Sequence, residues 1–203
     1  MRKMTAPLHD AIVTFDTCVS AIGNLPLRAA YQVCRPDILQ ANASFDLATQ
    51  NANWASLPRV PRGNPNVLVA GTLTKGQLVS LYTAHMVGTT GASRDIYDAI
   101  FSAAGGLCPF CGGLGQVRTL DHYLPKANFP AFSVHPKNLI PCCRDCNDGK
   151  NSSFGIGADE QALHPYLDQD HFFDERWLVA RAERSNPVLI RFECIPPNHW
   201  SDL

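Results

Sequence analysis

Four of the eight cysteines stand in two Cys-x-x-Cys pairs, Cys108 with Cys111 and Cys143 with Cys146. A two-residue gap lets both thiolates of a pair face one metal ion at a tight turn, and two such pairs complete a closed tetrahedral zinc site. A closed site has no open coordination position, so we expect this Zn²⁺ to be structural. A redox-active cysteine pair and buried free thiols are the alternatives, and two pairs in this arrangement favour zinc.

Polar residues with catalytic potential lie between and beside these pairs. An Asp-His step occurs at Asp121 and His122, Asn138 follows, and Asn147 comes directly after the last cysteine of the second pair. Each of these residues alone has an ordinary explanation, such as a turn for Asn138 or a helix surface for Asn147. Their occurrence together with the two cysteine pairs, in this order, is far more specific than any one of them.

The elements that must position these residues can be read from the same stretch. Residues 117–120 favour a strand that ends in Asp121 and His122, residues 138–140 a second strand, and residues 144–152 a short helix. This strand–loop–strand–helix order, with the Asp-His step and the sequence Cys-x-x-Cys-Asn-x-x-Lys, resembles the HNH endonuclease family, whose fold is called ββα-metal. The resemblance covers residues 108–152.

The resemblance implies a role for each residue. His122 would be the general base that takes a proton from water, a task that suits its near-neutral pKa. Asp121 and Asn147 would bind a catalytic Mg²⁺ or Mn²⁺ ion, since hard cations prefer oxygen ligands. Asn138 would hold the loop that orients His122, and Lys150 would contact phosphate. At the position of Asn147 the family often has His, which favours softer metal ions. With Asn at this position we prefer Mg²⁺ as the catalytic ion.

We predict an α+β fold in three regions. The first is a mostly helical region over residues 1–104, the second an HNH module with its zinc site over residues 105–156, and the third an acidic extension with a β-hairpin over residues 157–203. Apolar spacing predicts helices in residues 6–22, 37–56, 74–87 and from Ser93 to Gly105, whereas Pro26 and Pro36 limit any helix between them. Strands are expected at residues 176–184 and 188–195.

The charge distribution constrains how the protein meets its ligands. The net charge is −1, which argues against a protein that binds nucleic acid by bulk electrostatic attraction. No targeting signal and no membrane-spanning stretch is recognisable, so we expect a cytoplasmic protein that does not enter membranes.

We expect His135 to face solvent in the long loop, and His164 to lie in a loop of the acidic extension, away from any ligand spacing.

The resemblance implies a metal-dependent endonuclease that cuts DNA and leaves 5′-phosphate ends. The overall layout resembles HNH proteins of bacterial antiphage systems, such as those of Septu and some retron systems, which act beside an ABC-type ATPase. That resemblance implies a protein partner of this kind, and a restriction-like nuclease fits the same residues. The alternative is a zinc-stabilised adaptor for nucleic acid or protein without catalysis. Asp121 and His122 discriminate against it, because an adaptor has no physical need for both beside Asn147.

Overall fold

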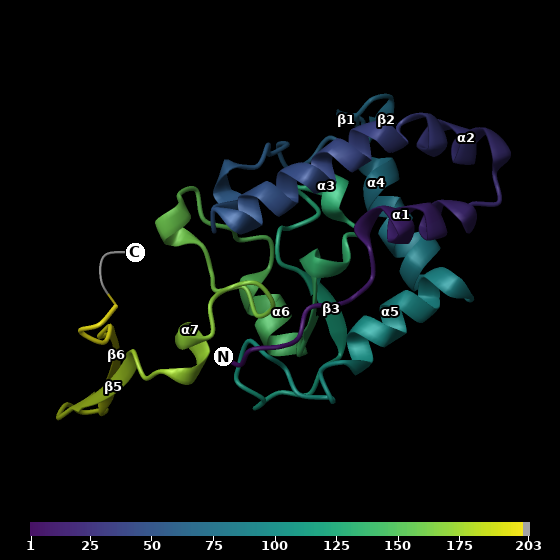
Figure 1. The fold of residues 1–203 in the computed structure, drawn as a ribbon. Helices are drawn as coiled ribbons and strands as arrows, with labels where there is room; N and C mark the ends of the chain where they lie inside the picture. Colours follow the sequence, from purple (N-terminus) through teal and green to yellow (C-terminus); the bar gives the residue numbers. More distant parts are fainter. Residues whose placement is uncertain (201–203) are drawn as a thin grey trace. The chain divides into compact units, whose positions relative to one another are not determined.

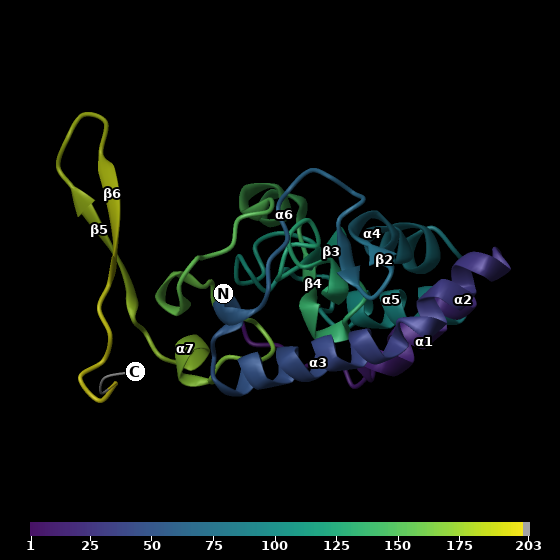
Figure 2. The same ribbon diagram turned by 90° about the horizontal axis from the view of Figure 1, so that it is seen from above.

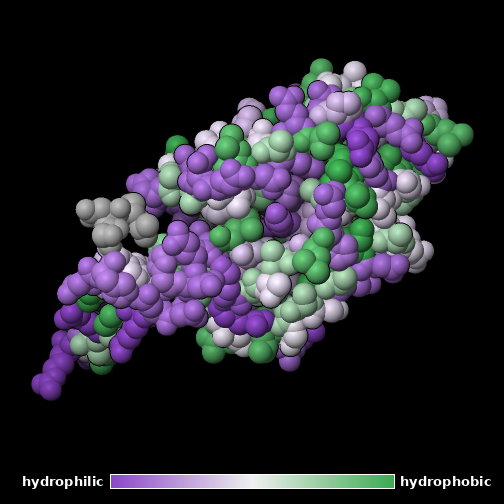
Figure 3. All heavy atoms as spheres, in the orientation of Figure 1, coloured by the Kyte–Doolittle hydropathy of each residue, from purple (hydrophilic) through white to green (hydrophobic). Residues whose placement is uncertain are grey.

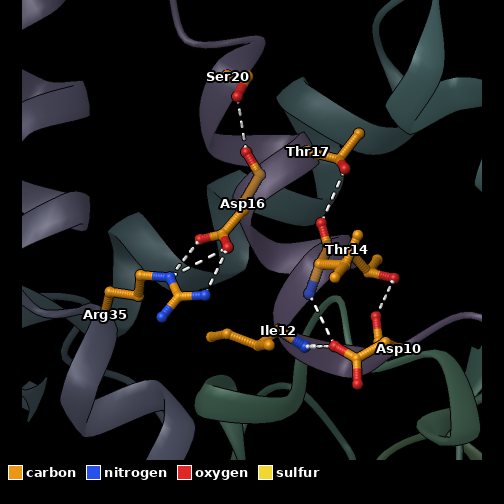
Figure 4. A network of polar contacts seen from close by, with 8 residues as sticks. Asp10, Ile12, Thr14, Asp16, Thr17, Ser20 and Arg35 are labelled. Carbon is orange, nitrogen blue, oxygen red and sulfur yellow. Dashed lines mark hydrogen bonds and ion pairs between the residues drawn. The ribbon is translucent and has the colours of Figure 1, made fainter.

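In the computed structural model, which describes residues 1–200, helix α1 (Ala11–Ser20) begins at a capped first turn. Asp10 precedes the helix, and its carboxylate accepts hydrogen bonds from two backbone N–H groups of that turn, each 2.9 Å long. Figure 4 shows this cap and a second contact, in which Asp16 pairs with Arg35 at 2.8 Å. Arg35 opens helix α3 (Arg35–Gln50), so the ion pair fixes how α1 and α3 cross.

The chain divides into two units, Met1–Leu167 and Asp168–Leu203. Unit 1 contains, besides α1 and α3, the helices α2 (Leu25–Val33), α4 (Lys75–Tyr82), the π-helical turn η2 (Thr83–Val87), α5 (Ala92–Ser102) and α6 (Arg144–Lys150). It also contains two antiparallel two-stranded sheets, β1 (Leu68–Ala70) with β2 (Leu73–Thr74) and β3 (Thr119–His122) with β4 (Leu139–Cys142). The predicted α+β class is thus confirmed.

One hydrophobic core lies between the helices and the β3–β4 hairpin (Figures 1 and 2). Leu120 of β3 and Leu139 of β4 are buried among Phe15, Leu81 and Ile100, which come from α1, α4 and α5. Each such side chain gains about 1.5–3 kcal/mol on leaving water. Packing against three helices therefore fixes the position of the hairpin, and with it the residues at the end of β3.

A second core joins the long helix to the segment that follows β3. Phe45 of α3 is fully buried and its ring lies 5.3 Å from that of Phe132, while Trp54 lies 5.4 Å from Tyr123. Residues that we assigned to a helical region and to a separate module therefore share one interior. Unit 1 extends to Leu167, beyond the expected boundary at residue 156, and the division by function stays a prediction.

Pro26 and Pro36 limit helix α2 as predicted. Pro26 lies in the first turn of α2, and the helix ends before Pro36, which lies in the first turn of α3. Proline is tolerated there because the N–H groups of the first turn have no partner within the helix. Helix α5 begins earlier than predicted, after Gly91 (φ 84°), and Ser93 is a buried residue within it.

The expected exposure of His135 was wrong, and His164, for which no exposure was predicted, is buried as well. His135 is 4% exposed and its ring lies 4.2 Å from that of Phe45. His164 is fully buried, 4.2 Å from the ring of Tyr123, and its Nδ1 accepts the backbone N–H of Tyr166. Both rings thus pack against side chains of the second core. A residue in a loop can be buried in this way where aromatic side chains surround it.

Unit 2 contains helix α7 (His171–Asp174) and the strands β5 (Leu178–Glu183) and β6 (Leu189–Cys194). The strands pair antiparallel from Leu178 opposite Cys194 to Glu183 opposite Leu189, which confirms the predicted hairpin. One of its faces carries cross-strand ion pairs, between Arg181 and Glu193 and between Arg191 and Glu183.

The helices of the described residues were compared with the requirements of a membrane span. Within residues 1–200, no helix combines the length and the apolar composition that crossing a bilayer requires. On the face drawn in Figure 3, hydrophilic side chains are spread among smaller hydrophobic groups.

The two buried histidines predict how stability depends on pH. Burial lowers the pKa of His135 and of His164 to about 3, against about 6.5 in an unfolded chain. Between these values only the unfolded chain takes up protons, so the free energy of unfolding is greatest above pH 6.5 and falls as the pH falls. Each histidine should contribute a slope of about 1.4 kcal/mol per pH unit.

Urea unfolding between pH 6.5 and pH 4.5 measures this slope. We expect His135→Phe, which keeps an aromatic ring beside Phe45, to flatten the dependence relative to the unmodified protein. His9→Gln, at an exposed position, is the matched control. Parallel curves for His135→Phe and the unmodified protein would show that His135 does not contribute.

Candidate functional site

The four paired cysteines come together in unit 1 and can hold a metal ion such as zinc. The sulfur atoms of Cys108, Cys111, Cys143 and Cys146 all lie within 4.8 Å of one another. Tetrahedral zinc with bonds of about 2.3 Å separates its sulfur ligands by roughly 3.8 Å, so the cluster needs only a small contraction. The prediction that these four cysteines come together is thus confirmed, and their spacing could hold a metal ion such as zinc.

Backbone geometry brings the two pairs together. The first pair lies on a loop closed by a hydrogen bond from Cys108 N–H to the Gly115 carbonyl (2.9 Å). In the second pair, Cys143 caps helix α6, and Cys146 lies within its first turns. Gly115 lies directly against Cys143, where an added Cβ atom would come within 2.7 Å of the Cys143 sulfur, so any larger residue would push the pairs apart.

The thiol groups in this cluster are unequal in acidity. The pKa of Cys108 is lowered to about 7, because backbone N–H groups of Cys143, Cys111 and Phe110 outweigh the effect of burial. Burial raises the pKa of Cys146. Since a metal ion binds thiolates, Cys108 is the ligand that is more ready to bind at neutral pH, and metal binding must release a proton from Cys146. Cys142, which the spacing excluded, lies outside the cluster and pairs with Thr119 across the strands.

His122 is held in one tautomer at the end of β3. It is 4% exposed, and its Nε2 lies 2.9 Å from the Ser133 carbonyl oxygen. A carbonyl only accepts, so Nε2 carries the hydrogen and Nδ1 is the basic nitrogen. Burial, followed by the charges of Lys126 and Lys150, lowers the pKa of His122 to about 3, while the bond to Ser133 opposes them. The ring is therefore neutral at pH 7.

Asp121 is a buried carboxylate with one close cation. Its Oδ2 lies 3.0 Å from Nζ of Lys150, which also donates to the His122 carbonyl (2.7 Å). Burial raises the pKa of Asp121, and Lys150, the His122 N–H and Lys126 counteract it. Lys150, predicted to contact phosphate, thus holds β3 and the Asp121 carboxylate, and its phosphate contact stays a prediction.

Asn138 is fully buried and joins the two ends of the long loop. Its Oδ1 accepts the Leu124 N–H (2.7 Å), and its Nδ2 donates to the carbonyls of Leu124 (3.1 Å) and Phe132 (3.0 Å). Phe132 directly precedes Ser133, whose carbonyl fixes His122. These contacts match the supporting role expected for Asn138. The Asn138 side chain itself does not reach the surface.

A cavity of about 860 Å³ brings the predicted catalytic residues together. Asp121, His122 and Asn147 all line it, whereas Asn138 and Lys150 are not part of the lining. Oxygen ligands from Asp121 and Asn147 in one water-accessible cavity fit a hard divalent cation that keeps several waters. The cavity can thus offer a neutral imidazole, two oxygen ligands and room for a phosphate group.

Sequence reasoning missed three residues that line the same cavity, namely Lys126, Lys75 and Tyr82. The Tyr82 ring lies 4.4 Å from the His122 ring, and its hydroxyl donates to the Leu120 carbonyl (3.2 Å). Lys126 follows Pro125 in the long loop, a position that offered a weak signal. Lys75 and Tyr82 lie far from the motif in sequence and stand out only once helix α4 is packed against β3.

The cysteine cluster predicts bound metal and its effect on stability. We expect purified protein to contain about one zinc ion per chain, and Cys146→Ser to lose most of it. The melting temperature should fall in that variant and after chelation, because metal-binding energy is also folding energy. Elemental analysis with thermal unfolding measures both, and Cys194→Ser, in unit 2, is the control. Full zinc content in Cys146→Ser would refute this ligand set.

Asn138 predicts a large loss of stability on truncation. Asn138→Ala removes three buried hydrogen bonds and leaves the N–H and the carbonyl of Leu124 unsatisfied, each at a cost of about 1–3 kcal/mol. The Phe132 carbonyl keeps the His135 N–H, so the third bond costs only about 1 kcal/mol more. We therefore expect urea unfolding to report a loss of at least about 3 kcal/mol. Asn128→Ala, which removes one hydrogen bond to the Val60 carbonyl at the surface of the same loop, should cost less. Equal effects would mean that Asn138 does not anchor the loop.

Comparison with known proteins places the chain in a family. No protein-family model matches it, and no solved structure matches it. It is 34% identical over 201 residues to protein ea31 of Escherichia phage lambda, an alignment that covers 98% of this chain and 68% of the phage protein. The chain therefore belongs to the family of protein ea31 of Escherichia phage lambda.

Proposed function

We propose that this protein is a metal-dependent HNH endonuclease that hydrolyses DNA phosphodiester bonds. The observation that carries the proposal is the placement of a neutral, tautomerically fixed His122 beside Asp121 and Asn147 in one cavity. Strands β3 and β4 and helix α6 supply these residues in the order that a ββα-metal core requires. We assign a structural role to zinc on the four cysteines, which would fix α6 against the loop of residues 107–116.

His122 is the general base in this proposal. Its Nε2–H is bound to Ser133, so Nδ1 is free to take a proton from a water molecule in the cavity. The low pKa keeps the ring unprotonated, and the negative charge of a bound phosphate raises its basicity toward the value that proton transfer needs. Ser133 then stabilises the imidazolium through the same carbonyl.

Asp121 and Asn147 would hold the divalent ion, Mg²⁺ or Mn²⁺. When bound, the ion stabilises negative charge on the scissile phosphate and on the departing 3′ oxygen. Lys150 keeps the Asp121 carboxylate in place through its 3.0 Å contact, and releases part of that contact when a cation of higher charge binds. Asn138 maintains the loop from Leu124 to Phe132 and thereby the Ser133 carbonyl.

The near-neutral chain suggests that a partner helps this protein to bind its DNA substrate. A net charge of −1 gives little attraction for DNA at a distance. We propose a cytoplasmic effector of an antiphage or restriction-like complex, in which a protein such as an ABC-type ATPase delivers the substrate.

Plasmid cleavage tests the proposal. Supercoiled DNA should be nicked in Mg²⁺ and not in EDTA, and His122→Ala should lower the rate by about 10²–10⁴-fold, the usual contribution of a general base. His85→Ala, a half-buried histidine outside the cavity, is the matched control. Cutting that survives in His122→Ala would refute this base, and a fully zinc-loaded protein that cuts no DNA, alone or in lysate of its host, would favour an adaptor.

A further inference from the structure

Helix α4 and the segment before it form a wall of the cavity that no HNH motif supplies. Gly63, Pro65, Lys75, Gly76, Val79 and Tyr82 line this wall, whereas residues 119–122, 125–127, 147–148 and 151–152 line the rest. The helical part of the chain thus contributes directly to the site, and its charged groups decide what the wall can bind.

Lys75 places a buried positive charge in this wall. The residue is 6% exposed, and its Nζ donates to the Pro61 carbonyl at 2.8 Å. An ammonium group has three hydrogens, so this bond leaves donors for a ligand. The backbone N–H groups at the start of α4 are already used, that of Lys75 by Val67 and that of Gly76 by Pro65. The attraction for an anion here therefore comes from the Lys75 ammonium group.

Lys126 places a second cation in the lining of the same cavity, on the loop that follows β3. Its Nζ lies 5.4 Å from the centre of the Tyr82 ring, a cation–π contact that holds the ammonium group in the cavity. Within residues 1–200 no carboxylate lies within 4.0 Å of the Lys126 or Lys75 Nζ atom. The two acids of the lining have other partners, Asp121 at 3.0 Å from Lys150 and Asp148 at 3.5 Å from Arg144.

We propose that Lys75 and Lys126 bind a backbone phosphate of the nucleic-acid strand next to the phosphate that is cut. The inference rests on the proposed nuclease function for its substrate, and it adds a binding subsite outside the HNH module. Asp121 attracts Lys126 only from beyond 4.0 Å, and its closer partner is Lys150. Two cations in one polar cavity, neither with a carboxylate in contact in the described chain, form an arrangement that a phosphate stabilises, since the bound anion offsets the cost of their burial.

Inorganic phosphate tests the subsite without any requirement for cleavage. The zinc-loaded protein, labelled with ¹³C and ¹⁵N, is titrated with phosphate while the side-chain Cε–Hε signals of lysine are followed by NMR. We expect the signals of Lys75 and Lys126 to shift and saturate. The signal of Lys137, which lies outside the cavity and pairs with Asp46, should not. No shift at either cavity lysine would overturn the proposal.

DNA binding tests the assignment of the ligand. Affinity for a fluorescent duplex is measured against salt concentration in Ca²⁺, for the unmodified protein, Lys126→Met and Lys137→Met. Loss of one phosphate contact should reduce the slope of log affinity against log salt by about 1 in Lys126→Met, and leave it unchanged in the control. Lys126 is half-buried and makes no hydrogen bond through Nζ in the described chain, so this variant keeps its fold, which circular dichroism verifies.

The two experiments separate the inference from the proposed function. Phosphate shifts at both lysines without any DNA binding or cutting would support the anion subsite and count against the nuclease. Metal-dependent cutting with an unchanged salt slope in Lys126→Met would support the nuclease and refute this subsite.

Discussion

The buried amide of Asn138 is the interaction on which the rest of the site depends. It binds the backbone at Leu124 and at Phe132, so the loop between β3 and β4 has fixed ends although it contains little regular structure. Ser133 follows directly, and its carbonyl selects the tautomer of His122. A buried amide is costly when one of its hydrogen bonds is missing, so a loop conformation that breaks any of the three bonds is disfavoured.

The environment of the site is built from both cores of unit 1. Leu120 and Leu139 anchor the hairpin among helices, while Tyr123 and Phe132 anchor the loop against Trp54 and Phe45. Charged residues at the end of β3 consequently lie at the border between packed side chains and a water-filled cavity. That border explains why burial shifts the pKa of Asp121 and His122 in the directions that disfavour their charged forms.

Short-range patterns in the sequence were sufficient for the parts of the site that are local. The cysteine spacing identified the metal-binding cluster, and the order of strand, loop, strand and helix located Asp121, His122 and Asn147 on the elements where they lie. Contacts between distant segments carry no such signal. The burial of His135 depends on Phe45, and the approach of Lys75 and Tyr82 to β3 depends on the packing of α4, so neither followed from local spacing.

Because unit 1 has a shared interior, residues 108–152 cannot be separated from the helical part of the chain without loss of packing. Many enzymes acquire new targets by fusing a self-contained catalytic cassette to a different recognition domain. Here Phe45 and Trp54, from the helical part of the chain, pack against Phe132 and Tyr123 of the segment that carries His122. Moving residues 108–152 alone into another chain would expose these aromatic rings and remove the α4 wall of the cavity. Recombination that preserves this cavity must therefore carry the helices with it.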